Sequence, residues 1–250
     1  MGERWAFRKA FRSVGPAVTP VIHVADERQA LGNVRVAIST GVAGVFLINH
    51  DFPMSDLLPV IRAVRARWPA LWLGVNFLGV SGADAFPVLG RLAAEGCAVD
   101  AYWADDARID EHRESQDEAQ EIDRVRAASG WQGLYFGGVA FKKQRHVAPA
   151  DWARAAAIAR PFVDVVTTSG PATGEAAEAR KITAFRAAIG DAPLALASGV
   201  TPENAPLYGA DVDCFLVATG INRPGDFYNI DPARLALLMR VTREIGGSHG

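Results

Sequence analysis

The stretch VDVVTTSG, residues 163–170, decides how this chain folds, and two later stretches repeat its pattern: PLALASG at 193–199 and DCFLVATG at 213–220. Each is an apolar run that is too short for a helix and that ends in a small polar turn containing glycine. Such runs are typical of buried parallel strands. In (β/α)₈ barrels, turns of this kind after the last strands offer backbone N–H groups to a phosphate. The three stretches therefore predict a barrel with a phosphate cradle.

Strand and helix patterns alternate along the rest of the chain. The expected strands are 17–24, 44–49, 71–77, 98–103, 133–141, 163–168, 194–197 and 214–218, and helical patterns separate them, including 174–189 and a short one at 202–208. This alternation predicts an α/β fold, and eight units in 250 residues favour a single (β/α)₈ TIM barrel with a parallel eight-stranded sheet. No Gly-x-Gly-x-x-Gly follows the first strand, which counts against a dinucleotide-binding fold. We expect one domain over residues 1–250, with residues 1–13 as a candidate N-terminal helix on the barrel floor.

Composition limits the partners and the compartment. The formal net charge is −2 and like charges form no block, so we expect no nucleic-acid partner. No apolar stretch reaches about 18 residues, and the N-terminus lacks the apolar core of a signal peptide, so we expect no membrane span and a cytoplasmic location. Cys97 and Cys214 are expected to be buried and reduced, with a catalytic thiol as the alternative. Nothing in the composition decides whether the chain forms a homo-oligomer.

The carboxyl ends of the strands carry the candidate functional residues, because active sites of such barrels lie there. His23 ends the first strand and could transfer protons, and Asp51, Asp105 and Lys142 are further candidate catalytic groups. The cradle turns and the neighbouring strand ends supply the expected substrate-binding residues. These are Asn49, Asn76, Trp103, Lys143, Thr168, Gly170, Thr173, Gly174, Ser198, Gly199, Thr219 and Gly220.

Each of these residues also has a purely structural interpretation. His23 could be a hydrogen-bonded histidine of the barrel end, Asp51 could belong to a turn, and the lysines could be solvated. His50 and Asp51 are adjacent, so at most one of them should face the site. We expect no cofactor. A divalent metal is a minor alternative, because no His-x-His spacing marks a metal site. Its ligands would be histidines and aspartates at the carboxyl ends of the strands, including His146.

The same residues resemble a known family. The segments SGPATG (169–174), SGVTPEN (198–204) and ATG (218–220) ahead of Gly225-Asp226 are similar to the carboxyl-terminal half of the BtpA family. VIH (21–23), GVNFL (74–78) and the basic stretch 143–146 fit more loosely. The resemblance implies a barrel of the ribulose-phosphate-binding type, in a family named for a role in photosystem I assembly or stability. The chain departs from the family pattern at Asn49-His50-Asp51, at 142–146 and at Thr219-Gly220 with Arg223, so it would be a divergent member.

Two functional interpretations follow from these residues. The first is an enzyme that acts on a phosphorylated small molecule, such as a sugar phosphate or phosphoribosyl compound, by lyase, isomerase or transferase chemistry. The second is a non-catalytic BtpA-like barrel that binds a ligand or partner as an assembly or stability factor. The density of titratable groups at the strand ends favours the enzyme. A metal-dependent hydrolase is a third, minor interpretation.

Overall fold

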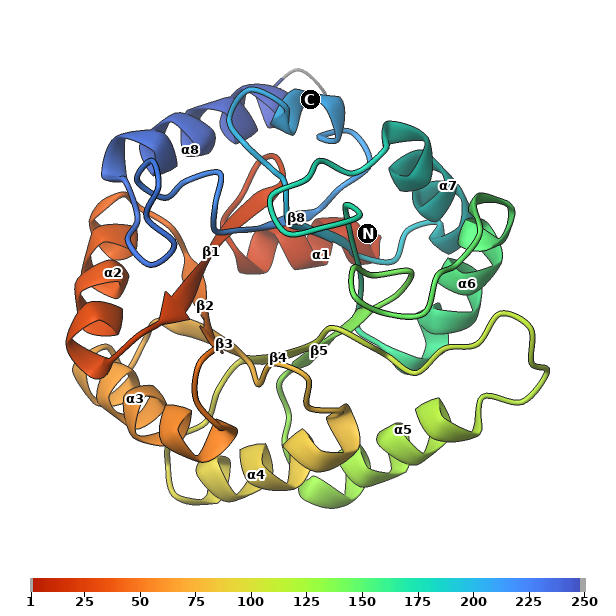
Figure 1. Ribbon diagram of the computed structural model, residues 1–250, viewed down its shortest axis with the longest axis horizontal. Coiled ribbons are helices and arrows are strands. Elements are labelled where there is room, and N and C mark those ends of the chain that lie inside the picture. The colour runs from red at the N-terminus through yellow and green to blue at the C-terminus, as the bar shows by residue number, and fades with distance from the viewer. Residues whose placement is uncertain (1, 248–250) are drawn as a thin grey trace.

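The computed structural model describes residues 2–247, and Met1 and residues 248–250 of the predicted domain lie outside the described residues. Eight strands pair in chain order from β1 to β8 and close into a barrel, because β1 also pairs with β8. Every strand pair is parallel. Helices α2 to α8 form a ring around the strands, and α1 crosses one end of the barrel (Figure 1). The predicted (β/α)₈ TIM barrel is therefore confirmed.

The elements have the following bounds. The strands are β1 (Ala17–Val24), β2 (Gly44–Asn49), β3 (Trp72–Asn76), β4 (Ala101–Ala104), β5 (Leu134–Gly138), β6 (Val165–Ser169), β7 (Leu194–Ala197) and β8 (Cys214–Val217). The helices are α1 (Glu3–Ala10), α2 (Glu27–Ser39), α3 (Met54–Arg67), α4 (Gly82–Ala94), α5 (Asp117–Ser129), α6 (Trp152–Ala159), α7 (Ala179–Ile189) and α8 (Pro232–Gly247), with short 3₁₀ helices η1 (Pro149–Asp151), η2 (Arg160–Phe162) and η3 (Ala205–Leu207).

Two apolar clusters divide the core, and the alternation of side chains along each strand assigns residues to them. In β1, Val18 and Ile22 belong to the larger cluster between strands and helices, whereas Ala17 and Val21 belong to the cluster inside the barrel. His23 has the same parity as Val21, so its side chain points into the barrel at the carboxyl end of the strand. The same argument applied to every strand decides which predicted residues can reach the site.

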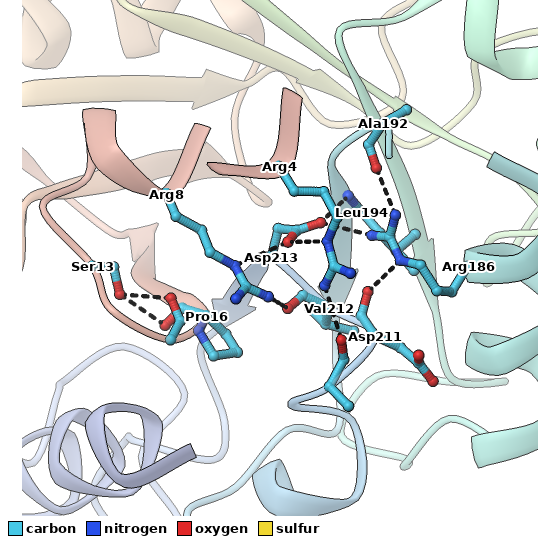
Figure 2. A network of polar contacts seen from close by, with 12 residues as sticks. Arg4, Arg8, Ser13, Pro16, Arg186, Ala192, Leu194, Asp211, Val212 and Asp213 are labelled. Carbon is cyan, nitrogen blue, oxygen red and sulfur yellow. Dashed lines mark hydrogen bonds and ion pairs between the residues drawn. The ribbon is translucent and has the colours of Figure 1, made fainter. Parts of the chain in front are cut away.

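Helix α1 closes the amino-terminal end of the barrel. Its Phe7, and Phe11 directly after it, join the interior cluster, and the Phe11 ring lies 4.8 Å from the ring of Trp72. Beside them, the fully buried carboxylate of Asp213 accepts hydrogen bonds from Arg4 and Arg8. Figure 2 shows these two guanidinium groups converging on Asp213 from the side of α1. The floor is thus fixed by aromatic packing and by a buried ion-pair network.

The Asp213 contact repeats around the barrel floor. Asp100, Asp164 and Asp213 each directly precede an even-numbered strand, and each accepts the backbone N–H at or beside the first residue of the preceding strand. Each also pairs with an arginine of an odd-numbered helix: Asp100 with Arg65, Asp164 with Arg126 and Asp213 with Arg186. This recurring pair ties β4, β6 and β8 each to the preceding strand and to a covering helix, which places it in the stabilising half of the barrel.

Several element boundaries differ from the expected ones. Where a helix was expected at 202–208, only η3 forms, because Pro206 lacks the N–H that would continue the turn into an α-helix. Helix α7 begins at Ala179 rather than at residue 174, because Gly174 has a φ of +82° and the chain from 170 to 178 runs as a loop over the barrel end. None of the helices within 2–247 is long and apolar enough to cross a membrane.

Candidate active site at the carboxyl end of the barrel

A small cavity opens at the carboxyl ends of the strands, and we call it the mouth cavity. Its volume is about 50 Å³. Its polar lining residues are His23, His50, Trp103, Asp105, Lys142, Lys143, Thr173, Ser198 and Thr219. Eight of these nine side chains, all except His50, were predicted as site residues from the strand ends and the turns that follow them. The barrel therefore brings residues from distant sequence positions to one point.

His23 is buried at the base of this cavity. Its Nδ1 lies 3.1 Å from the backbone oxygen of Phe227, and its ring lies 3.9 Å from the Phe227 ring. A carbonyl oxygen only accepts, so Nδ1 carries the proton and Nε2 keeps its lone pair. Burial lowers the pKa of His23 to about 4, with a smaller contribution from His50. The expected titration near neutrality is therefore displaced, and His23 is a neutral imidazole suited to accept a proton at Nε2.

His50, rather than Asp51, faces the cavity. The His50 ring lies 4.6 Å from the ring of His23, and burial lowers its pKa as well. Asp51 is exposed and accepts a hydrogen bond from the Tyr228 hydroxyl at 2.7 Å, so the structure does not bring this predicted catalytic residue into the cavity. The alternation from Ile48 along β2 assigns the inward position to residue 50, a signal that the sequence contains.

The buried Asn76 and the half-buried Asp105 form a hydrogen-bonded pair on the wall of β3 and β4. Asn76 Nδ2 donates to Asp105 Oδ1 over 3.0 Å, and burial raises the pKa of the Asp105 carboxyl. Trp103 is 4% exposed and lies two residues before Asp105 on the same inward face. The raised pKa brings Asp105 closer to the range in which a carboxyl group can both give and take a proton.

Lys142 spans the opposite side of the cavity. Its Nζ donates to Ser198 Oγ over 2.6 Å and to Thr173 Oγ1 over 3.1 Å. Burial lowers the pKa of Lys142, whereas the charge of Asp105 raises it. Neutral hydroxyls are its direct partners, so the ammonium charge is not neutralised by a contacting carboxylate and remains available to an anionic ligand.

A second, wider cavity of about 490 Å³ adjoins the first, and it contains the predicted cradle. Its lining includes Gly174, Gly199, Thr219, Gly220 and Arg223, and Thr219 lines both cavities. Within the described residues, the backbone N–H groups of Gly199, Thr219 and Gly220 donate to no protein acceptor. We call these three N–H groups the cradle. Free N–H groups in glycine turns at strand ends are the usual protein ligands of a phosphate.

Close backbone contacts require glycine at three positions in the loops that build the cradle: Gly170, Gly199 and Gly220. A Cβ on Gly199 would lie 2.0 Å from the backbone oxygen of Glu175, and a Cβ on Gly170 would meet the same atom at the same distance. A Cβ on Gly220 would lie 1.9 Å from the backbone oxygen of Val200. The loops after β6, β7 and β8 therefore pack on one another through their backbones, and this packing orients the cradle N–H groups.

Arginines near the cradle were not among the predicted site residues. The exposed side chain of Arg223 makes no hydrogen bond or ion pair within residues 2–247, although it lies near Asp226, whereas its backbone N–H donates to the Asn229 backbone oxygen. Arg234 Nε donates to the Gly220 backbone oxygen over 3.0 Å and thereby supports the loop. Arg223 follows Thr219-Gly220 by three residues, and this proximity is the sequence signal that could have identified it.

Other predicted substrate-binding residues lie outside the mouth cavity. Asn49 accepts from the Leu78 N–H and donates to the Phe52 backbone oxygen, so it joins two loops. Thr168 has the outward parity of Val166, and its hydroxyl donates to the Val139 backbone oxygen. Thr167, one residue earlier, takes the inward parity of Val165. The structure thus holds Asn49 and Thr168 beneath or behind the site.

One group of three residues within 2–247 places potential metal ligands within 4.8 Å of one another: Glu111, His112 and Asp151. It lies outside the mouth cavity, and the Glu111 carboxylate already binds both terminal nitrogens of Arg145. The histidines and aspartates considered as metal ligands from the sequence form no such group in the described part of the chain.

Comparison with known proteins places the fold among solved barrels. No protein-family model matches this chain, and no curated protein matches it at a significant level. A structure described as native KDPGal superposes with a TM-score of 0.61 at 14% identity, over 91% of this chain and 95% of that chain. Phosphoribosyl anthranilate isomerase from Thermus thermophilus gives a TM-score of 0.58 at 15% identity, over 92% and 99% of the two chains. The tryptophan synthase alpha chain from Legionella pneumophila subsp. pneumophila gives 0.64 at 15% identity, over 100% and 99%.

At these identities the likeness shows the fold alone. It agrees with the expected (β/α)₈ barrel, and the ribulose-phosphate-binding type stays a prediction. The BtpA resemblance stays a prediction.

Proposed function

We propose that this chain is an enzyme that acts on a phosphorylated small molecule, such as a sugar phosphate or phosphoribosyl compound. The phosphate would bind at the cradle and beside Arg223, and the rest of the molecule would extend into the mouth cavity. The observation that carries the proposal is the shared wall: Thr219 lines both the cradle cavity and the cavity that holds His23 and Asp105. A fixed phosphate would therefore present the adjoining carbon atoms to acid–base groups.

The roles follow from the geometry. His23 Nε2 accepts a proton, because Nδ1 is held by the Phe227 backbone oxygen and the ring is neutral at pH 7. Asp105, whose pKa is raised by burial, is the second acid–base group that lines the cavity. Lys142 supplies positive charge between cradle and cavity. A base and an acid facing one substrate suit isomerase or lyase chemistry. The phosphoribosyl substrate in the name of one fold neighbour agrees with this class of ligand.

Calorimetry and thermal unfolding with inorganic phosphate and a panel of phosphosugars test the proposal. A ligand at 100 times its Kd should add about 2.7 kcal/mol to the free energy of unfolding. Arg223→Gln should weaken phosphate binding about tenfold, whereas Arg154→Gln, an exposed arginine of α6, should leave it unchanged. No binding of any phosphorylated compound would refute the proposal. Binding without turnover across the panel would instead support the non-catalytic, ligand-binding barrel.

A further inference from the structure

Buried polar atoms without partners gather at the barrel mouth. Within residues 2–247, five buried side-chain nitrogen or oxygen atoms have no hydrogen-bond partner, and three of them are Trp103 Nε1, Asn76 Oδ1 and His50 Nε2. Trp103 and His50 line the mouth cavity, and Asn76 is bonded to Asp105, which lines it too. A buried polar atom without a partner is costly, so such a cluster indicates that something else completes it.

The strand register places two of the residues that carry these atoms side by side. Gly74 of β3 pairs with Ala101 of β4, so two residues further on Asn76 stands opposite Trp103. Both side chains point into the barrel and are almost fully buried, at 1% and 4% exposure. The Asn76 amide orientation is set by donation from Nδ2 to the Asp105 carboxylate, which leaves Oδ1 as the free atom. A residue with a free acceptor therefore stands next to a residue with a free indole donor on the neighbouring strand, and both side chains point to the same interior.

We propose that Trp103 Nε1 and Asn76 Oδ1 form a subsite for an uncharged hydroxyl group, so that the ligand is a phosphorylated polyol or sugar rather than a phosphorylated carboxylic acid. A hydroxyl accepts from the indole N–H and donates to the amide oxygen, so one group satisfies both atoms. A carboxylate could accept from Trp103 but has no proton for Asn76 Oδ1, and it would lie beside Asp105. The proposal rests on the proposed function and names the chemistry of the end opposite the phosphate.

The charges around the cavity agree with a neutral group at this end. Both lysines that line the cavity, Lys142 and Lys143, come from the loop after β5. Lys142 donates to Ser198 and Thr173 on the cradle side, and Lys143 is exposed. No arginine lines the mouth cavity within the described residues. A cavity of about 50 Å³ suits a terminal hydroxymethyl group, with the remaining atoms extending along the wider cradle cavity.

Calorimetric titration with three probes tests the subsite: inorganic phosphate, ribitol 5-phosphate and ribonic acid 5-phosphate. The last two have the same length and differ only in a terminal hydroxymethyl or carboxylate group. Ribitol 5-phosphate should bind at least about tenfold more tightly than inorganic phosphate, and ribonic acid 5-phosphate no more tightly than inorganic phosphate. Trp103→Phe keeps an aromatic ring and removes the N–H. It should lower ribitol 5-phosphate affinity about tenfold and leave inorganic phosphate binding unchanged.

A matched variant controls for the loss of an indole donor. Trp131 is also buried, and its Nε1 donates to the Val99 backbone oxygen at a distance of 3.0 Å. Trp131 does not line the mouth cavity. Trp131→Phe should leave all three affinities unchanged. Equal or tighter binding of ribonic acid 5-phosphate by the unmodified protein would overturn the subsite, as would unchanged ribitol 5-phosphate binding in Trp103→Phe. Either result leaves the proposed function standing if inorganic phosphate binds, whereas absence of all binding overturns both.

Discussion

Lys142 Nζ lies 2.6 Å from Ser198 Oγ, and this contact joins the loop after β5 to the loop after β7 across the barrel mouth. Ser198 has a φ of +64°, an uncommon conformation for a residue other than glycine. The strained turn directs its hydroxyl towards the lysine and precedes the free N–H of Gly199. One side-chain contact thus couples the acid–base side of the cavity to the cradle.

Removal of this ammonium should weaken anion binding. Lys142→Met keeps the length and apolar stem of the side chain but deletes the charge, so we expect the Kd for inorganic phosphate to rise about tenfold. Calorimetry measures the effect. Lys143→Met removes a neighbouring charge that is exposed and should change the Kd by less than about threefold, since exposed charges are screened. Equal effects of the two variants would show that only the overall charge matters.

The cradle glycine should be needed for folding as well as for binding. In Gly199→Ala the new Cβ would lie 2.0 Å from the Glu175 backbone oxygen at a φ of +68°. We expect a loss of about 2–4 kcal/mol in the free energy of unfolding, measured by urea denaturation. Gly41 is the matched control, because it has a φ of +90° with open space around it. Gly41→Ala should cost only about 1 kcal/mol, and similar losses in both variants would contradict the close-contact argument.

The barrel could be predicted from the chain because its strands are continuous apolar runs that end in clear turns. The strand stretches at 44–49 and 194–197 match β2 and β7 residue for residue. Boundaries were wrong where tertiary packing outweighs local pattern. The stretch 174–178 has a helical composition, yet its backbone packs against Gly170 and Gly199 and stays a loop. Such a contact joins residues far apart in sequence, so no local pattern contains it.

The sequence was sufficient to predict which loops form the candidate site. It was less successful in predicting which side chains of those loops face the cavity. His23, Asp105 and Lys142 line the cavity because they stand at inward positions or directly follow a strand. Asp51 is the member of the adjacent pair that was predicted as catalytic, although the period of two along β2 assigns the inward position to His50. The depressed pKa of His23 depends on burial beneath Phe227, a residue some 200 positions away in the chain, so sequence alone gave no access to it.

The ion-pair network of the floor should contribute strongly to stability. Asp213 is fully buried and pairs with Arg4, Arg8 and Arg186, so Asp213→Ala leaves three partly buried guanidinium groups without their carboxylate. We expect a loss of at least about 3 kcal/mol in urea denaturation. Asp100 is the matched control, since it makes the same kind of contact but its side chain is 42% exposed. Asp100→Ala should lose less than half as much, and a larger loss there would contradict the burial argument.

His23 should carry the proton-transfer step. His23→Asn removes the basic Nε2, so turnover of a phosphosugar substrate should fall at least about a hundredfold, while the Kd for inorganic phosphate stays within about twofold. Steady-state kinetics and calorimetry separate the two effects. In the unmodified protein the low-pH limb of kcat should lie near pH 4 rather than 6.5, because burial lowers the pKa of His23 to about 4. Full activity of His23→Asn would transfer the role to Asp105.

The same histidine should make stability depend on pH in mildly acidic solution. Its pKa is about 4 in the folded protein and 6.5 in the free side chain. Between these values the unfolded chain binds a proton that the folded chain excludes, so stability falls as the pH falls from 6.5 towards 4 and is constant above 6.5. For this group the loss from pH 7 to pH 5 is about 2 kcal/mol in the free energy of unfolding.

Urea denaturation of His23→Asn tests this dependence. The difference in free energy of unfolding between pH 7 and pH 5 should be about 2 kcal/mol smaller in this variant than in the unmodified protein. His146→Asn, which replaces an exposed histidine, should keep the dependence of the unmodified protein. An unaltered difference in His23→Asn would mean that the imidazole is protonated without cost, and that it is not the neutral base that the mouth geometry requires.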